Sequence, residues 1–185
     1  MKISFSSIWP GLVSAGLLAA CTAPKQGAHL LDVPFLEQPD DLCGPASVSM
    51  VARFYGVEPD LDKLEQDVFL PALAGSIPEL LAEGARRQGL AAEVVRGDEP
   101  QLHEWLAAGF PLILLLAPAG KEPRGHFVVA TGSKPAQSAL RVHSGSRQNR
   151  WLAARHWKKR WDDAGNKIVL IRPAESTAKR GKEEL

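Results

Sequence analysis

The stretch QPDDLCGPASVSMVARFYG, residues 38–56, decides how this chain folds. Pro45 suits the first turn of a helix, and Gly56 suits its end. Between them, apolar residues recur at the spacing of a buried helical face: Val48, Val51, Ala52 and Tyr55. Cys43 therefore stands where a loop ends and the first core helix begins.

Helix signals come early in the rest of the chain. Further helices are predicted over residues 61–68 behind Asp60, from a capping box at 76–79 to near Gly89, and after a second box at 98–101. Strand-like runs lie between and after these helices, at residues 92–96, 112–116, 126–131, 139–143 and 167–171. The chain therefore belongs to the α+β class.

The turn-rich residues 132–138 are short enough to join the third and fourth strands as a hairpin. We therefore expect a mainly antiparallel sheet. With 185 residues, 45% hydrophobic and 23% charged, the chain suits one globular domain, placed at 30–173 and followed by a charged tail at 174–185.

The net charge of +1 gives no field that favours nucleic acid, so none is expected as a partner. A basic stretch from Arg147 to Arg160 is interpreted as the solvated face of a helix. Trp157 and Trp161 are four residues apart and should pack that helix over the sheet. A membrane-facing use of the stretch is the alternative.

Residues 1–20 have the pattern of a signal peptide, because the apolar run after Lys2 is too short for an ordinary spanning helix. The segment Leu18–Cys21 resembles the lipobox of bacterial lipoproteins. The resemblance implies cleavage before Cys21, lipidation of that cysteine, and a tether over residues 21–29. Thr22 after the cysteine implies an outer-membrane anchor facing the periplasm. The alternative is a secretory peptide in which Cys21 is incidental.

A lipidated Cys21 would leave Cys43 as a lone thiol in an oxidising compartment. The N-terminal end of a helix favours the thiolate, so we expect a lowered pKa for Cys43; the alternative is a small buried hydrophobe. His126 is the best candidate base, since it opens an apolar strand directly after a loop. The histidines interpreted as plain surface residues are His29, His103 and His156.

Together, Gln38, Leu42–Val51, Phe54–Gly56 and Gly125–Val129 resemble the papain-like bacteriocin-processing peptidases, which remove double-glycine leader peptides. The resemblance covers most of the mature chain. It implies a papain-like α+β fold with N-terminal helices packed on a mainly antiparallel sheet. It also implies that Cys43 attacks, that His126 is the general base, and that Gln38 helps the Cys43 backbone N–H bind the oxyanion.

One position departs from the family pattern. The family places an Asp at the end of the strand after the histidine strand, whereas this chain has Ser144, with His143 as a neighbouring rival. A hydroxyl stabilises an imidazolium less than a carboxylate does. Either the enzyme uses Ser144 as a weak third member, or the domain binds polypeptide without cleaving it.

The sequence thus predicts a lipid-anchored cysteine peptidase acting on an exported or envelope polypeptide. The alternatives are a non-catalytic peptide-binding module and acyl transfer to an amine, which would use the same Cys–His pair. Neither a metal nor an organic cofactor is implied, because no histidine or carboxylate cluster has ligand spacing.

Overall fold

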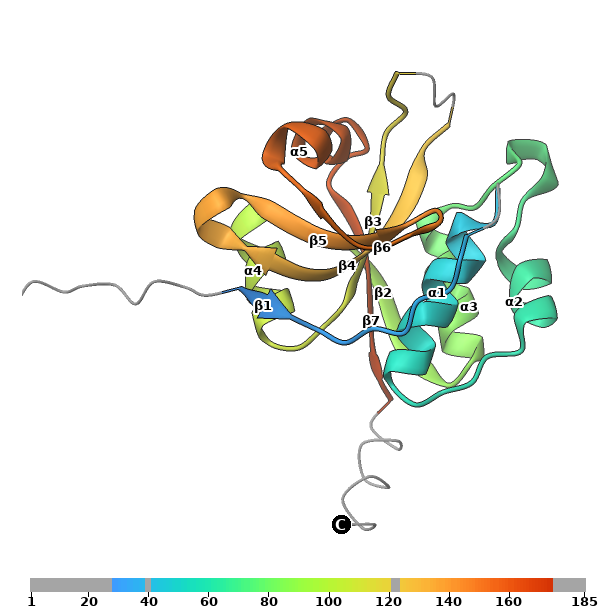
Figure 1. The fold of residues 1–185 in the computed structure, drawn as a ribbon. Coiled ribbons are helices and arrows are strands. Elements are labelled where there is room, and N and C mark those ends of the chain that lie inside the picture. Colours follow the sequence, from blue (N-terminus) through green and yellow to red (C-terminus); the bar gives the residue numbers. More distant parts are fainter. Residues whose placement is uncertain (1–27, 39–40, 121–123, 175–185) are drawn as a thin grey trace, which may run out of the picture.

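The computed structural model describes residues 28–38, 41–120 and 124–174 (Figure 1). The expected signal peptide, Cys21, most of the tether and nearly all of the charged tail lie outside the described residues. No helix in the described part is both long and apolar enough to cross a membrane.

Five α-helices and two short 3-10 turns are present in the described part. The helices are α1 Cys43–Phe54, α2 Leu61–Val68, α3 Pro78–Arg87, α4 Glu99–Ala107 and α5 Ala154–Asp163. The 3-10 turns are η1 Pro71–Leu73 and η2 Pro135–Gln137.

The strands form one sheet in which every pair is antiparallel, as expected. They are β1 His29–Leu30, β2 Leu90–Arg96, β3 Leu112–Leu116, β4 His126–Lys134, β5 Ala139–Ser144, β6 Arg147–Leu152 and β7 Lys167–Pro173. Their order is β2-β7-β3-β4-β5-β6, with β1 paired to β4. The expected hairpin joins β4 to β5, although β4 runs further than predicted and η2 makes the turn.

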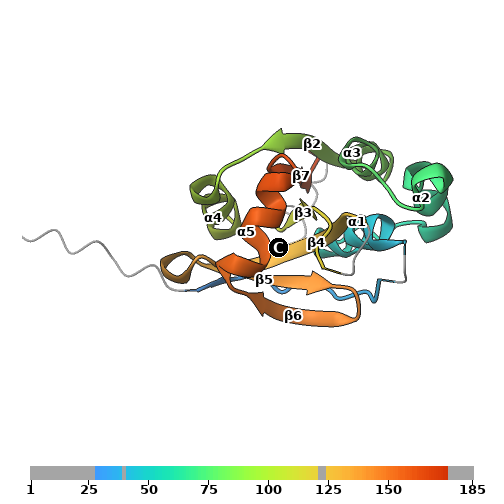
Figure 2. The same ribbon diagram turned by 90° about the horizontal axis from the view of Figure 1, so that it is seen from above.

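Helices cover both faces of the sheet (Figure 2). Alternate residues of each central strand face opposite sides, so Ile113 and Val129 pack with α1, α2 and α3, whereas Leu114 and Val128 pack with α4 and α5. Trp157 and Trp161 are both 1% exposed, with ring centroids 5.8 Å apart. The prediction that they pack their helix onto the sheet is confirmed.

Two of the three predicted helix caps are confirmed, and the third is wrong. The Asp60 carboxylate accepts the Lys63 N–H at 3.1 Å, and the capping box of Asp98 and Gln101 is complete. The box predicted from Ser76 is wrong, because α3 begins at Pro78 and its N-cap is Ile77. Ser76 lies one residue too early to cap, and its hydroxyl oxygen is buried without a described partner.

The basic stretch is not one helix. Residues from Arg147 to Leu152 form strand β6, and helix α5 starts only at Ala154. The segment forms a strand because it pairs with β5, which supplies its backbone hydrogen bonds. Its own side chains do not alternate between polar and apolar, so the sequence contains no strand signal here. A turn containing Gly145, at a φ of 59°, brings the chain back for this pairing.

Candidate active site

A cavity of about 810 Å³ opens at the end of the sheet toward which the start of α1 points. Its walls come from the start of α1, the loop before α3, the ends of β3 and β5, the start of β4, and parts of β6 and α5. All four residues predicted to be catalytic line it: Gln38, Cys43, His126 and Ser144. The fold thus brings together residues that are more than a hundred positions apart in sequence.

The N-terminal end of α1 faces this cavity without a side-chain cap. The N-cap is Leu42, which has no polar side chain, and Pro45 has no N–H. The backbone N–H groups of Cys43 and Gly44 therefore lie beside the Cys43 sulfur, together with the N–H of Phe127 on β4. Phe127 directly follows His126, so this contact ties the thiol to the histidine strand.

The pKa of the Cys43 thiol is nevertheless raised above its ordinary value of 9.0. Burial is the main cause, and the charge of Asp41 adds to it, while the three backbone N–H groups act in the opposite direction. The expectation that the helix end alone would lower this pKa is wrong, because desolvation of the thiolate outweighs these hydrogen bonds.

His126 opens β4, where it pairs in register with Leu116 of β3. Its Nε2 lies 2.9 Å from the Ser144 hydroxyl oxygen at the end of β5. A hydroxyl group therefore stands where the related peptidases are expected to carry a carboxylate.

His143, the alternative partner for His126, makes different contacts. Its Nε2 lies 2.9 Å from the Val33 carbonyl oxygen, and its Nδ1 accepts the Asn149 N–H at 3.1 Å. Both ring nitrogens of this fully buried side chain are thus engaged, and the side chain does not line the cavity. Burial lowers its pKa below 6.5, which keeps the ring neutral.

Gln38 is held by two hydrogen bonds that fix the orientation of its side-chain amide. Its Oε1 accepts the Gly145 N–H at 2.7 Å, and its Nε2 donates to the Ser47 hydroxyl at 3.1 Å. Because a backbone N–H can only donate, the amide oxygen must face Gly145. One N–H of Nε2 is then used by Ser47, and within the described part of the chain no partner is present for the second, on a side chain that lines the cavity.

Ser47 and Gly145 were missed by the sequence reasoning. Ser47 lies one helical turn after Cys43 and is fully buried. A polar residue on the same helical face as the cysteine is the sequence signal that could have identified it. Gly145 gave only a turn signal. Its N–H and carbonyl both bond Gln38, so the turn after Ser144 also positions the amide.

The remaining histidines lie elsewhere or serve other contacts. His29 is in β1 and His156 is exposed at the cavity margin, so both fit a surface position. His103 does not, since it is only 8% exposed on α4, 3.5 Å from a Glu99 carboxylate oxygen. Burial lowers the pKa of His103. Across residues 28–38, 41–120 and 124–174, no cluster of His, Cys, Asp or Glu is arranged to hold a metal ion.

Solved structures of peptidase domains share this architecture. A double glycine motif protease from an AMS/PCAT transporter, in complex with the leader peptide, is 22% identical with a TM-score of 0.64, covering 78% of this chain and 94% of that one. The peptidase domain of Streptococcus ComA is 21% identical with a TM-score of 0.60, covering 79% and 99%. A C39-like peptidase from Bacillus anthracis is 17% identical with a TM-score of 0.65, covering 80% and 99%.

These likenesses confirm the predicted fold class, a papain-like α+β peptidase fold. The model of the Peptidase_C39 like family matches residues 30–169, and the chain belongs to this family. No curated protein sequence matches it significantly.

Proposed function

We propose that this chain is a lipid-anchored cysteine peptidase of the bacterial envelope that cleaves an exported or envelope polypeptide. The observation that supports this most is the shared cavity. Cys43, His126 and Gln38 line it together, and the backbone N–H next to His126 lies at the Cys43 sulfur.

Cleavage would begin with proton transfer from Cys43 to His126. Since Nε2 contacts Ser144, Nδ1 of the same ring would accept the proton from Cys43. The resulting thiolate attacks the scissile carbonyl carbon and forms a C–S bond, which moves the carbonyl electron pair onto oxygen. The Cys43 N–H and the second N–H of Gln38 Nε2 would stabilise this oxyanion.

Collapse of the oxyanion would break the C–N bond, and the imidazolium of His126 would give its proton to the leaving amine. The Cys43 thioester remains. Water then attacks the thioester with His126 accepting its proton, and the acid product leaves as the thiol is restored. An amine in place of water would give acyl transfer through the same residues.

The imidazolium has a weak partner here, which favours the rival function of a non-catalytic peptide-binding module. Ser144 offers a neutral oxygen, whereas a carboxylate would stabilise the charged ring more strongly. The raised pKa of the Cys43 thiol favours the same rival, because less of the sulfur is then present as the attacking thiolate.

A polypeptide substrate fits the size of the cavity and the known ligand of a relative. The transporter protease at 22% identity was solved in complex with a leader peptide. A cavity of about 810 Å³ can hold several residues of an extended chain.

The anchor and location rest on the sequence alone. Lipidation at Cys21 would hold the domain at a membrane outside the cytosol, where an unexported leader peptide would not be met. The substrate is therefore an exported or envelope polypeptide, and the location is the outer membrane on its periplasmic side.

Activity is tested with a proteome-derived peptide library whose new ends are identified by mass spectrometry. The full-length parent should generate cleavages that Cys43→Ala abolishes and that the control His29→Ala retains, since His29 on β1 does not line the cavity. Library cleavage equal in the parent and Cys43→Ala would refute the peptidase and leave the binding module.

Anchoring is tested separately by growing cells with a clickable palmitate analogue. The parent should carry the label and Cys21→Ser should not. Equal label in both proteins, or none in the parent, would refute the lipoprotein assignment without bearing on Cys43.

A further inference from the structure

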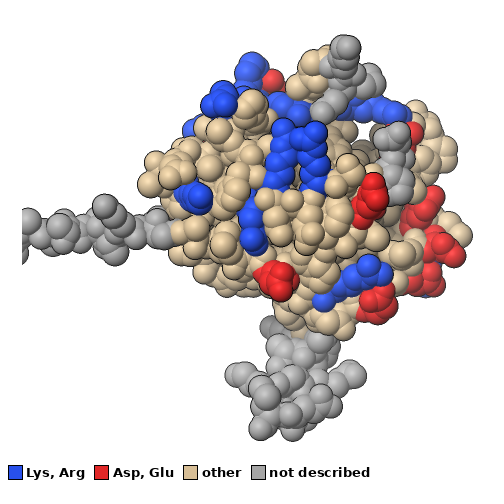
Figure 3. Space-filling view, viewed as in Figure 1, with Lys and Arg blue, Asp and Glu red and all other residues tan. Residues whose placement is uncertain are grey.

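The two walls of the cavity differ in chemistry. The loop before α3 supplies an apolar wall, in which Leu73 is 54% exposed. The opposite wall, from β6 and α5, carries Arg150, His156 and Arg160. Figure 3 shows Lys and Arg side chains gathered over this part of the surface, whereas Asp and Glu gather over α2.

The described residues bring little negative charge to the lining of the cavity. Asp41 is the single acidic residue among the described residues that line the cavity, and it forms an ion pair with Arg124. The Arg124 Nη1 also donates to the Ala74 carbonyl oxygen at 3.2 Å. Asp41 and Arg124 therefore neutralise each other beside the loop before α3.

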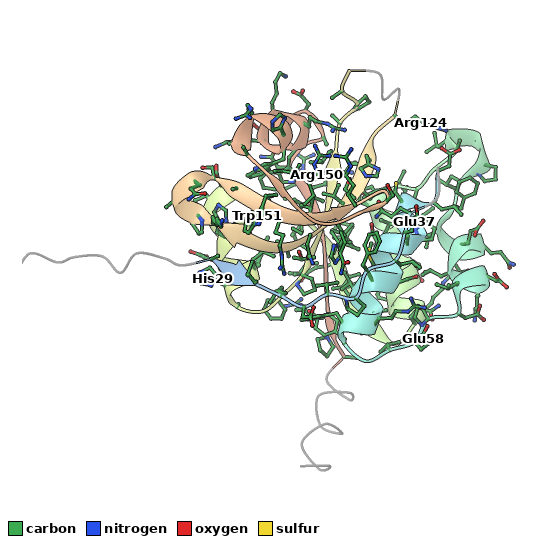
Figure 4. The ribbon with its side chains drawn as sticks, in the orientation of Figure 1. His29, Glu37, Glu58, Arg124, Arg150 and Trp151 are labelled. Atoms are coloured by element: carbon green, nitrogen blue, oxygen red, sulfur yellow. The ribbon has the colours of Figure 1, made fainter. Side chains whose placement is uncertain are left out.

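Arg150 faces the cavity because successive side chains of strand β6 point to opposite sides of the sheet. Arg150 and Leu152 line the cavity, whereas Trp151 between them does not. Arg150 pairs in register with Val142 of β5, the strand that ends in Ser144. Figure 4 shows Arg150 on the face formed by α5 and β6. The guanidinium is thus carried by the same sheet as His126.

Arg150 differs from several other arginines of the fold, which form ion pairs within the chain. Arg53, Arg86, Arg87 and Arg172 each pair with a carboxylate of this chain. For Arg150 the described residues supply no carboxylate, although its side chain is exposed. A cation that faces a substrate cavity, with no counter-ion among the described residues, is suited to a charge on the substrate.

We propose that the cavity selects polypeptides with an acidic side chain, Asp or Glu, at one position close to the scissile bond, and that Arg150 binds this side chain. The proposal rests on the proposed peptidase function and adds a specificity-determining residue to it. A guanidinium can bind a carboxylate through two parallel N–H groups, which the shorter, neutral amide of a glutamine cannot replace.

The test compares cleavage profiles of the same peptide library for the full-length parent, Arg150→Gln and Arg150→Glu. Arg147→Gln is the matched control, since Arg147 is exposed on the same strand but does not line the cavity. In the parent, Asp and Glu should be enriched at one position about two- to fivefold, the range of an exposed ion pair. Arg150→Gln should remove the enrichment, Arg147→Gln should keep it, and Arg150→Glu should favour Lys and Arg there.

Each result decides the question. Cleavage without an acidic preference, or a preference that survives Arg150→Gln, overturns the role of Arg150 and leaves the peptidase intact. If the parent cleaves nothing, the peptidase fails, and peptides retained by the immobilised parent are sequenced instead. Acidic enrichment that Arg150→Gln removes would then support the charge selection as binding, and its absence would overturn it.

Discussion

Replacement of Gln38 by Glu separates the catalytic use of this side chain from its structural use. In the parent, the Gly145 N–H donates to the Gln38 Oε1 at 2.7 Å, and a Glu at this position keeps an oxygen that can accept the same hydrogen bond. Its second oxygen can accept from the Ser47 hydroxyl, which turns to donate. The fold is therefore kept, while the N–H available to an oxyanion is lost and a negative charge takes its place.

The magnitude follows from the loss of one oxyanion donor, which costs about 10²- to 10³-fold in rate, or about 2.7–4 kcal/mol. We expect Gln38→Glu to slow acylation of Cys43 by p-nitrophenyl acetate at least about 100-fold. Alkylation by iodoacetamide displaces iodide and forms no oxyanion. The ratio of the acylation rate to the alkylation rate therefore isolates the oxyanion effect from any change in thiolate population.

Two controls complete this assay. Cys43→Ala gives the blank, because it retains Cys21, and subtracting its rate removes any contribution of that cysteine. Gln38→Ala breaks both buried hydrogen bonds, so its free energy of unfolding should fall by about 1–3 kcal/mol, unlike that of Gln38→Glu. A Gln38→Glu protein whose acylation-to-alkylation ratio stays within about threefold of the parent would refute the oxyanion role.

Three further changes have defined outcomes. Ser144→Asp should speed acylation by p-nitrophenyl acetate about tenfold at pH 7, because a carboxylate stabilises the imidazolium of His126; a slower variant would contradict this. His143 titrates in the unfolded chain near pH 6.5 and has a lowered pKa when folded, so it lowers the free energy of unfolding as the pH falls through 6.5. In urea unfolding at pH 7.5 and 5.5, His143→Gln should therefore shrink the difference by about 1 kcal/mol, and an unchanged difference would argue against it. A methyl group at Gly44 would lie 2.5 Å from the Ser76 hydroxyl oxygen, so Gly44→Ala should cost about 1–3 kcal/mol by thermal unfolding, whereas an unaltered Tm would show that the loop yields freely.

Local signals predicted much of the fold. The caps at Asp60 and at Asp98–Gln101 join residues three positions apart, so both partners can be recognised within one short segment of sequence. The motif around Cys43 and the strand opened by His126 identified the cavity, because a helix start and a strand start are local features. Which of His143 and Ser144 contacts His126 depends on the register of β5, and this became clear only from the fold.

Long-range contacts account for what was missed. Strand β6 forms because β5 offers an unpaired edge, and residues 147–151 are all exposed, so they lack the alternation that marks a strand. Ser76 has the letters of a cap, but the helix starts later, and its hydroxyl lies against Gly44. The pKa of Cys43 depends on how deeply neighbouring segments bury the sulfur, which no motif states.

The most direct measurement is the pH profile of Cys43 alkylation by iodoacetamide in the parent, His126→Ala and His29→Ala, the last a control outside the cavity lining. Burial, with the charge of Asp41, raises the thiol pKa above 9.0. Without a base to take the proton, His126→Ala should therefore react only above that pH. A parent in which His126 accepts the proton should react at least about one pH unit lower, and His29→Ala should match the parent. Superimposable profiles for the parent and His126→Ala would contradict a working Cys–His pair.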